Sequence, residues 1–187
     1  MSAKKRWMVL SLAVLTLSLG LLSAADGLAG QRGRRGAGLV PLTEAEKTTL
    51  TFMREEEKLA RDVYIKLFEK WNDRIFSNIA VSEQRHMDAL LQQLLKYGVP
   101  DPTAGSEIGT FKNPDLQKAY DELVAQGEMS LADALRVGRM IEEMDIEDLL
   151  AAIDETAKTD LERVYGNLLK GSYNHLQAFT LHPDCII

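Results

Sequence analysis

Ionisable residues interrupt two apolar helical stripes in the first half of this 187-residue chain. The first stripe, at spacings of three and four, runs through Leu50, Met53, Glu57, Ala60, Tyr64, Leu67 and Trp71. The second runs through Phe76, Ile79, Glu83, His86, Leu90, Leu94 and Tyr97. A charge that projects into a packed interior is costly unless it is paired or binds a metal ion. We therefore predict that Glu57, Glu83 and His86 are paired or bind metal inside a helix bundle.

Four long helices are predicted from stripes of this kind and from the capping residues that precede them. Thr43 with Glu46, and Thr159 with Glu162, each match a capping box, and Ser130 suits the N-cap of the third helix. The expected helices cover about 44–71, 74–97, 131–155 and 160–180.

The connection between the second and third of these helices is long. It runs from about residue 99 to 129, with a short helix expected between the Asn113-Pro114 cap and Gly127. A connection of this length does not suit a simple hairpin, but it can cross a bundle. We therefore predict an all-α, ferritin-like four-helix bundle with a long crossover between helices two and three.

The second half of the chain also carries ionisable residues at core spacing. Glu142 and Asp145 lie three apart on the third helix, and His175 lies on the stripe of the fourth. The third helix has two overlapping apolar stripes, so Glu143 competes with Glu142 as its inward acid. Three residues before His175 stands Ser172, where a carboxylate would complete a second Glu-x-x-His pair.

Carboxylates and imidazoles on four facing helices indicate a metal site. These ligand types suit Fe(II) and Mn(II), and bridging carboxylates can hold two such ions close together. Two dications would also neutralise acids that otherwise repel one another. The predicted metal ligands are Glu57, Glu83, His86, Glu142, Asp145 and His175.

Several segments resemble a known family. Residues 57–64 (Glu-Lys-Leu-Ala-Arg-Asp-Val-Tyr) and 83–86 (Glu-Gln-Arg-His) are similar to the first two ligand helices of the rubrerythrin branch of ferritin-like proteins. Residues 61–64, 141–146 (Ile-Glu-Glu-Met-Asp-Ile) and 172–176 (Ser-Tyr-Asn-His-Leu) more closely resemble the DUF2202 domain family. The resemblance covers about residues 43–180.

The resemblance implies a carboxylate-bridged pair of iron or manganese ions that acts on O2 or peroxide as an oxidase or peroxidase. Cys185 is the sole cysteine, so the chain lacks a four-cysteine rubredoxin-like module and any electron donor must be external. The missing carboxylate at Ser172 leaves an alternative open, in which the bundle binds metal without catalysis or is purely structural. Whether the protein is an enzyme, and whether it forms a homo-oligomer, are also left open.

The N-terminus has the order of a secretory signal. Three basic residues at 4–6 precede an apolar run at about 8–22, and small residues at 23–25 offer a cleavage site. We expect residues 1–25 to direct export to the periplasm or exterior; an uncleaved membrane anchor is the alternative. Residues 26–42 form a predicted flexible Gly/Arg linker, 43–180 the helical domain and 181–187 a C-terminal tail. A net charge of -6 argues against a nucleic-acid partner.

Overall fold

The computed structural model describes residues 39–185, which contain five α-helices and no β-strand. These are α2 (Glu44–Trp71), α3 (Arg74–Tyr97), α4 (Pro114–Gly127), α5 (Leu131–Glu155) and α6 (Thr159–Thr180), followed by the 3-10 turn η1 (Pro183–Cys185). The predicted all-α class is confirmed. The signal sequence expected at 1–25 and most of the expected linker lie outside the described residues.

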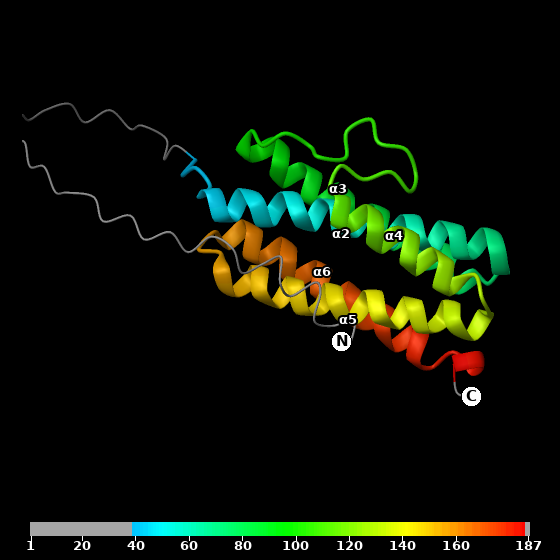
Figure 1. Cartoon of the computed structure of the whole chain (residues 1–187). Helices are drawn as coiled ribbons and strands as arrows, with labels where there is room; N and C mark the ends of the chain where they lie inside the picture. The colour runs from blue at the N-terminus through cyan, green and yellow to red at the C-terminus, as the bar shows by residue number, and fades with distance from the viewer. Residues whose placement is uncertain (1–38, 186–187) are drawn as a thin grey trace, which may run out of the picture. The chain divides into compact units, whose positions relative to one another are not determined.

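Two helical hairpins form the bundle. The α2–α3 hairpin closes through two residues and the α5–α6 hairpin through three, so the helices within each pair run antiparallel. The hairpins meet through contacts of α2 with α5 and of α3 with α6. Helix α4 lies in the connection between them and packs on α2 and α5 (Figure 1). This arrangement brings the interior faces of α2, α3, α5 and α6 together.

Most of the predicted caps are present. Thr43 and Glu46 form the expected capping box at the start of α2, and Ser130 caps α5 through the backbone N–H of Asp133. The box predicted at Thr159 is wrong, because α6 begins one residue earlier and Lys158 stands at its N-cap without a side-chain bond. Thr156, in the preceding turn, accepts the Lys158 N–H instead.

The bundle interior is layered along its length. An aliphatic cluster fills the half near the start of α2, and it includes Leu50, Met53, Leu90, Leu94, Leu149, Leu161 and Leu168. In the other half, Tyr64, Phe76 and Phe179 pack with ring centroids 5.4–6.4 Å apart. On α2, α3 and α6 the predicted ligand residues occupy the sequence positions between these two clusters, and on α5 they precede Leu149 of the aliphatic cluster. They therefore lie in a polar layer enclosed by apolar ones.

The crossover is held against α2 by buried charges. Lys58 is 2% exposed and pairs with Asp62, which has no exposed surface. The Lys58 ammonium also donates to the backbone carbonyls of Glu107 and Thr110, at 2.8 and 3.2 Å. Asp62 in turn accepts the backbone N–H of Gly109 at 2.9 Å. These bonds fix the loop before α4 over one side of the bundle.

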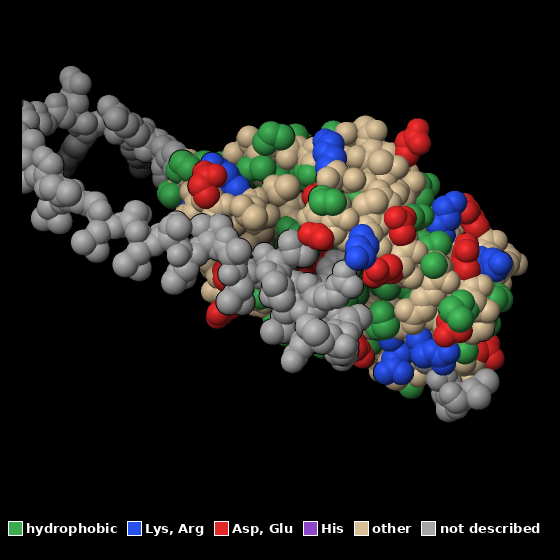
Figure 2. Space-filling view, in the orientation of Figure 1, with side chains coloured by type: hydrophobic (Ala, Val, Ile, Leu, Met, Phe, Trp, Pro, Cys, Tyr) green, Lys and Arg blue, Asp and Glu red, His purple; other side chains and the backbone are tan. Residues whose placement is uncertain are grey.

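The outer faces of the described helices are solvated. Acidic and basic side chains are interspersed over the surface seen in Figure 2. No helix among residues 39–185 is both long enough and apolar enough to cross a lipid bilayer.

Candidate metal centre

All six predicted ligand residues are buried in the middle of the bundle. Their exposed fractions range from 1% for Glu57 and Glu142 to 9% for His86. Helix α2 contributes Glu57, α3 contributes Glu83 and His86, α5 contributes Glu142 and Asp145, and α6 contributes His175. The structure therefore brings residues up to 118 positions apart in the chain, Glu57 and His175, into one interior layer.

The first group that could hold a metal ion consists of Glu57, Glu83 and His86. The Nδ1 atom of His86 lies 3.1 Å from Oε2 of Glu57 and 2.8 Å from Oε2 of Glu83. One potential ligand atom from each residue lies within 4.8 Å of the others. The i, i+3 spacing of Glu83 and His86 on α3 places both on the same side of this group.

The second group consists of Glu83, Glu142 and His175, and it shares Glu83 with the first. Nδ1 of His175 lies 2.9 Å from Oε1 of Glu83 and 3.3 Å from Oε2 of Glu142. Its potential ligand atoms also fall within 4.8 Å of one another. The rings of His86 and His175 are stacked with centroids 5.5 Å apart. Glu83 therefore presents one oxygen to each histidine, so a single carboxylate serves both groups.

Several of these buried atoms lack a hydrogen-bond partner among the described residues. They include Oε1 of Glu57, Oδ1 of Asp145 and Nδ1 of His175. The 2.9 Å approach of His175 to Glu83 is close in distance but not aligned as a hydrogen bond. Leaving such atoms buried and unpaired is costly. Metal coordination would satisfy them, so the residues present fit a metal centre.

Asp145 lies beside the two groups and belongs to neither. Its Oδ2 atom accepts a hydrogen bond of 2.5 Å from the hydroxyl of Ser172, and both side chains are buried. Ser172, where a second Glu-x-x-His pair would have its glutamate, thus holds a carboxylate that comes from α5. On the other side, Tyr64 donates to Oε1 of Glu142 at 2.6 Å.

Burial makes most of these acids hard to ionise. It raises the pKa of Glu142 to about 8, and the Glu83 charge adds to the rise. It also raises the pKa of Asp145 to about 7, against the hydrogen bond from Ser172. Burial and the nearby Asp145 together raise the pKa of Glu57 well above its usual value. The cluster therefore holds protons that a bound cation would displace.

Glu83 and the two histidines behave in the opposite way. Burial alone would raise the pKa of Glu83, but the close approach of the His175 and His86 imidazoles outweighs burial and lowers the pKa to about 2. Burial would also lower the pKa of each imidazole. The facing carboxylates nevertheless raise the pKa of His86 to about 11 and that of His175 to about 10. Without metal, the shared carboxylate therefore lies between two imidazoles that both favour the protonated form.

The choice between Glu142 and Glu143 is decided by the rotation of α5. Glu142 is 1% exposed and faces His175, whereas Glu143 is partly exposed and lies 3.9 Å from Arg139. The inward acid is therefore Glu142.

A pair of acids beside the centre, the buried Glu56 and the partly buried Asp148, was not among the predicted site residues. Glu56, which the spacing places beside the stripe, is 4% exposed and shares a hydrogen bond with Asp148. Burial raises the pKa of both, and in Glu56 the Asp148 charge adds to the effect. Asp148 lies on the second of the two apolar stripes of its helix, which also contains Ile141 and Met144. This position could have indicated from the sequence that Asp148 faces inward.

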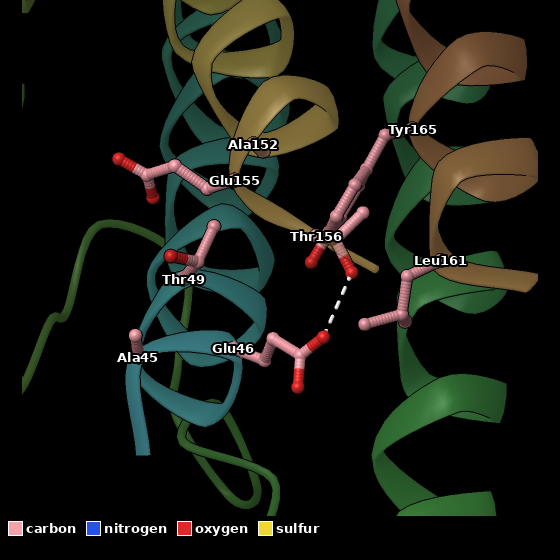
Figure 3. Close-up of a pocket in the computed structure, with 8 residues that line it drawn as sticks. All are labelled: Ala45, Glu46, Thr49, Ala152, Glu155, Thr156, Leu161 and Tyr165. Atoms are coloured by element: carbon pink, nitrogen blue, oxygen red, sulfur yellow. Dashed lines mark hydrogen bonds between the residues drawn. The ribbon is translucent and has the colours of Figure 1, made fainter. Parts of the chain in front are cut away.

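A small cavity lies away from this cluster, where α5 ends and α2 and α6 begin. Glu46, Thr156 and Tyr165 are among the residues that line it, and Thr156 donates to Glu46 (Figure 3). Its volume of about 10 Å³ has room for roughly one water molecule. It is too small for an organic substrate.

Comparison with known proteins identifies the family to which the chain belongs. A model of the uncharacterized protein domain family DUF2202 matches residues 46–183. The chain is 52% identical over 139 residues to uncharacterized protein MJ0754 of Methanocaldococcus jannaschii, a match that spans 74% of this chain and 75% of that protein. The crystal structure of hypothetical protein MJ0754 is similar with a TM-score of 0.74 and 48% identity, over 83% of each chain.

A more distant likeness concerns the fold alone. The crystal structure of a DUF305 fragment from Deinococcus radiodurans gives a TM-score of 0.58 at 16% identity, over 75% of this chain and 95% of that one. The DUF2202 model, in contrast, covers most of the chain, and MJ0754 exceeds half identity. The family predicted from the sequence is confirmed: this chain belongs to the DUF2202 family.

Proposed function

We propose that this protein is a ferritin-like metalloprotein that binds two iron or manganese ions through a bridging carboxylate. The observation that carries the proposal is the pair of buried Glu/Glu/His groups that share Glu83. Two hairpins joined by a long crossover also match the connectivity of ferritin-like bundles. The resemblance of the ligand helices to the rubrerythrin branch supports the same assignment.

Each residue has a defined part in this centre. Glu83 would contribute to both ion positions, Glu57 and Glu142 would each hold one ion, and His86 and His175 would bind through Nδ1 as neutral imidazoles. Nε2 of His175 lies 2.9 Å from the hydroxyl of Ser82, and an Nε2–H that donates to this hydroxyl would leave Nδ1 free to bind an ion. When bound, the ions would supply open coordination positions for O2 or peroxide and exchange electrons with it.

Asp145 provides the remaining carboxylate in this proposal. Its Oδ1 atom has no hydrogen-bond partner among the described residues and could bind an ion, and Asp145 interacts electrostatically with both Glu57 and His86. The Ser172 hydroxyl orients this carboxylate through its hydrogen bond to the other oxygen, Oδ2. The centre then has a carboxylate from α5 where rubrerythrin-like proteins use one from the fourth helix.

The proposed activity is that of an exported oxidase or peroxidase supplied with electrons by another protein. The signal-like N-terminus supports export, and the single cysteine of the chain supports an external electron donor. The specific observation that favours the alternative, metal binding without catalysis, is Ser172 in place of a carboxylate.

Metal analysis after anaerobic loading with Fe(II) tests the metal centre. We expect about two ions per chain in the parent. Glu83→Gln keeps the side-chain volume but removes the shared charge, so it should bind less than one ion. Glu143→Gln, one residue from Glu142 but outside both groups, is the matched control and should bind as the parent does. Equal binding by Glu83→Gln and the parent would refute the shared site.

The activity has its own test. The loaded protein is mixed with O2 or hydrogen peroxide in the presence of a chemical reductant, and consumption of the oxidant is followed. Turnover that is lost in Glu83→Gln supports the oxidoreductase. Two bound ions without turnover would restrict the function to metal binding. Export is tested by the N-terminal residue of the protein from its native host, which should lie near position 26.

A further inference from the structure

Gly171 lies in the interior of α6, where glycine is less favourable than alanine and therefore needs a reason. A Cβ atom added to Gly171 would lie 2.5 Å from Nε2 and 2.8 Å from Cε1 of His86. Carbon atoms do not approach a ring this closely, so any side chain at this position would displace the imidazole. Gly166, on the same helix, offers the opposite case, because a Cβ there would have no neighbour within 4 Å.

The His86 ring is held at its Nδ1 atom and on one face, on sides other than the one that meets Gly171. Its Nδ1 atom is held by Glu57 and Glu83, at 3.1 and 2.8 Å. Its face stacks on His175, whose own Nε2 is bonded to Ser82. A ring pushed away from α6 at Nε2 must therefore tilt or shift at Nδ1. Such a shift changes the packing of the bundle little, but it moves Nδ1, the atom that would bind metal.

We propose that Gly171 is a positioning residue for the metal centre. The lack of a side chain on this turn of α6 lets the His86 imidazole lie against the helix backbone with Nδ1 directed at Glu57 and Glu83. The inference rests on the proposed function, because it assigns Gly171 to the first of the two ion positions. The packing of the His86 ring against Gly171 can also be measured without metal.

Metal binding by Gly171→Ala and Gly166→Ala forms the first test. Binding of Mn(II) to the full chain is measured by titration calorimetry together with metal analysis. We expect Gly171→Ala to weaken the position of Glu57, Glu83 and His86 about tenfold or more, comparable to the loss of a residue that orients a ligand. The second position should be retained, so that stoichiometry at limiting metal falls toward one ion. Gly166→Ala should bind two ions as the parent does.

A metal-free double-mutant cycle forms the second test. The urea midpoint of unfolding is measured for Gly171→Ala in the parent and in a His86→Ala background. In the His86→Ala background, Gly171→Ala should raise the urea midpoint, as we also expect for Gly166→Ala, because only the better helix propensity of alanine remains. In the parent background, Gly171→Ala should not raise the midpoint. The difference between the two backgrounds is the coupling between Gly171 and His86.

The two tests separate the failure of this inference from that of the proposed function. A parent chain that binds no Mn(II) or Fe(II) would overturn the metal centre, while the cycle still reports whether Gly171 makes room for His86. An equal effect of Gly171→Ala in both backgrounds would overturn the positioning role. So would a Gly171→Ala protein that binds two ions with the affinity of the parent.

Discussion

In the polar layer, the neutral side chain of Ser172 supports the acid Asp145, as Tyr64 supports Glu142. Ser172 has no exposed surface, and its hydroxyl reaches Asp145 from α6. The hydroxyl is small enough to fit beside the carboxylate. It donates a hydrogen bond, so it stabilises the ionised acid that a metal requires. A glutamate at the same place would add a further buried negative charge next to Asp145.

We expect Ser172→Ala to lower metal affinity without preventing folding. The substitution removes the donor to Asp145 and leaves the volume almost unchanged, so the carboxylate loses its orientation. Loss of such a supporting bond weakens metal binding by about 10- to 100-fold in comparable sites. The measurement is Mn(II) affinity by calorimetry. Ser77→Ala is the control, because the Ser77 hydroxyl bonds only to the carbonyl of Arg74. Equal affinities for both variants would contradict the role given to Ser172.

At the level of the helices, two faces of α2 have different roles. One face supplies Glu57 to the polar layer, and another holds the crossover through Lys58 and Asp62. The ring of Phe111 adds to this attachment, because the Lys58 ammonium lies 4.3 Å from its centroid. The crossover is thereby tied to the helix that carries the first ligand.

We expect Lys58→Met to destabilise the protein strongly. Asp62 would keep its bond to Arg61, but it would lose the buried ammonium, and two backbone carbonyls of the crossover would lose their donor. Breaking a buried ion pair from one side costs about 3–5 kcal/mol. Urea unfolding of the metal-free chain gives the value. Lys66→Met, which removes an exposed lysine paired with Glu69, should leave the midpoint almost unchanged. A similar loss in both variants would show that the Lys58 pair is not special.

The helix ends show how far local signals extend. Thr43, Asn72 and Ser130 cap or turn the chain as their residue types predict, and Asn72 takes the left-handed conformation with φ of 52°. Thr159 is not a cap, because α6 begins at Thr159 itself, and in the turn before it Thr156 donates to Glu46 of α2. That bond joins residues 110 positions apart, which no local rule can anticipate.

For the molecule as a whole, the polar layer links metal binding to pH. The folded protein raises the pKa of His86 to about 11 and that of His175 to about 10, against about 6.5 in an unfolded chain. Their contribution to the stability of the metal-free fold is therefore full below about pH 6.5 and is lost as pH rises toward 10. Metal ions must displace the same protons, so they bind more tightly as pH rises.

We accordingly expect Mn(II) to raise the melting temperature more at pH 8 than at pH 6. The raised pKa values of Glu142 and Asp145, about 8 and about 7, act in the same direction, because these acids also release protons to the ion. Differential scanning calorimetry with and without Mn(II) at the two pH values measures the effect. The Glu83→Gln variant should show little stabilisation at either pH. A larger shift at pH 6 than at pH 8 would contradict the expected proton release.

The sequence alone was enough to predict the long helices, most of their caps and the residues that face inward. These properties depend on spacings of three and four and on the preferences of single residues, which act within one or two turns. Glu57, Glu83, His86 and His175 could be selected because each interrupts an apolar stripe. Their role as metal ligands stays a prediction.

The tertiary structure decided how these residues meet. Glu83 faces both histidines, Glu142 rather than Glu143 points inward, Ser172 binds Asp145, and Glu56 is buried beside Asp148. Each of these depends on the rotation and offset of one helix against another. Periodicity predicts which side of a helix is apolar. It defines the rotation of that side only to within a few tens of degrees, and it does not define the axial register of one helix against another. The packing of the aliphatic and aromatic layers on either side sets both.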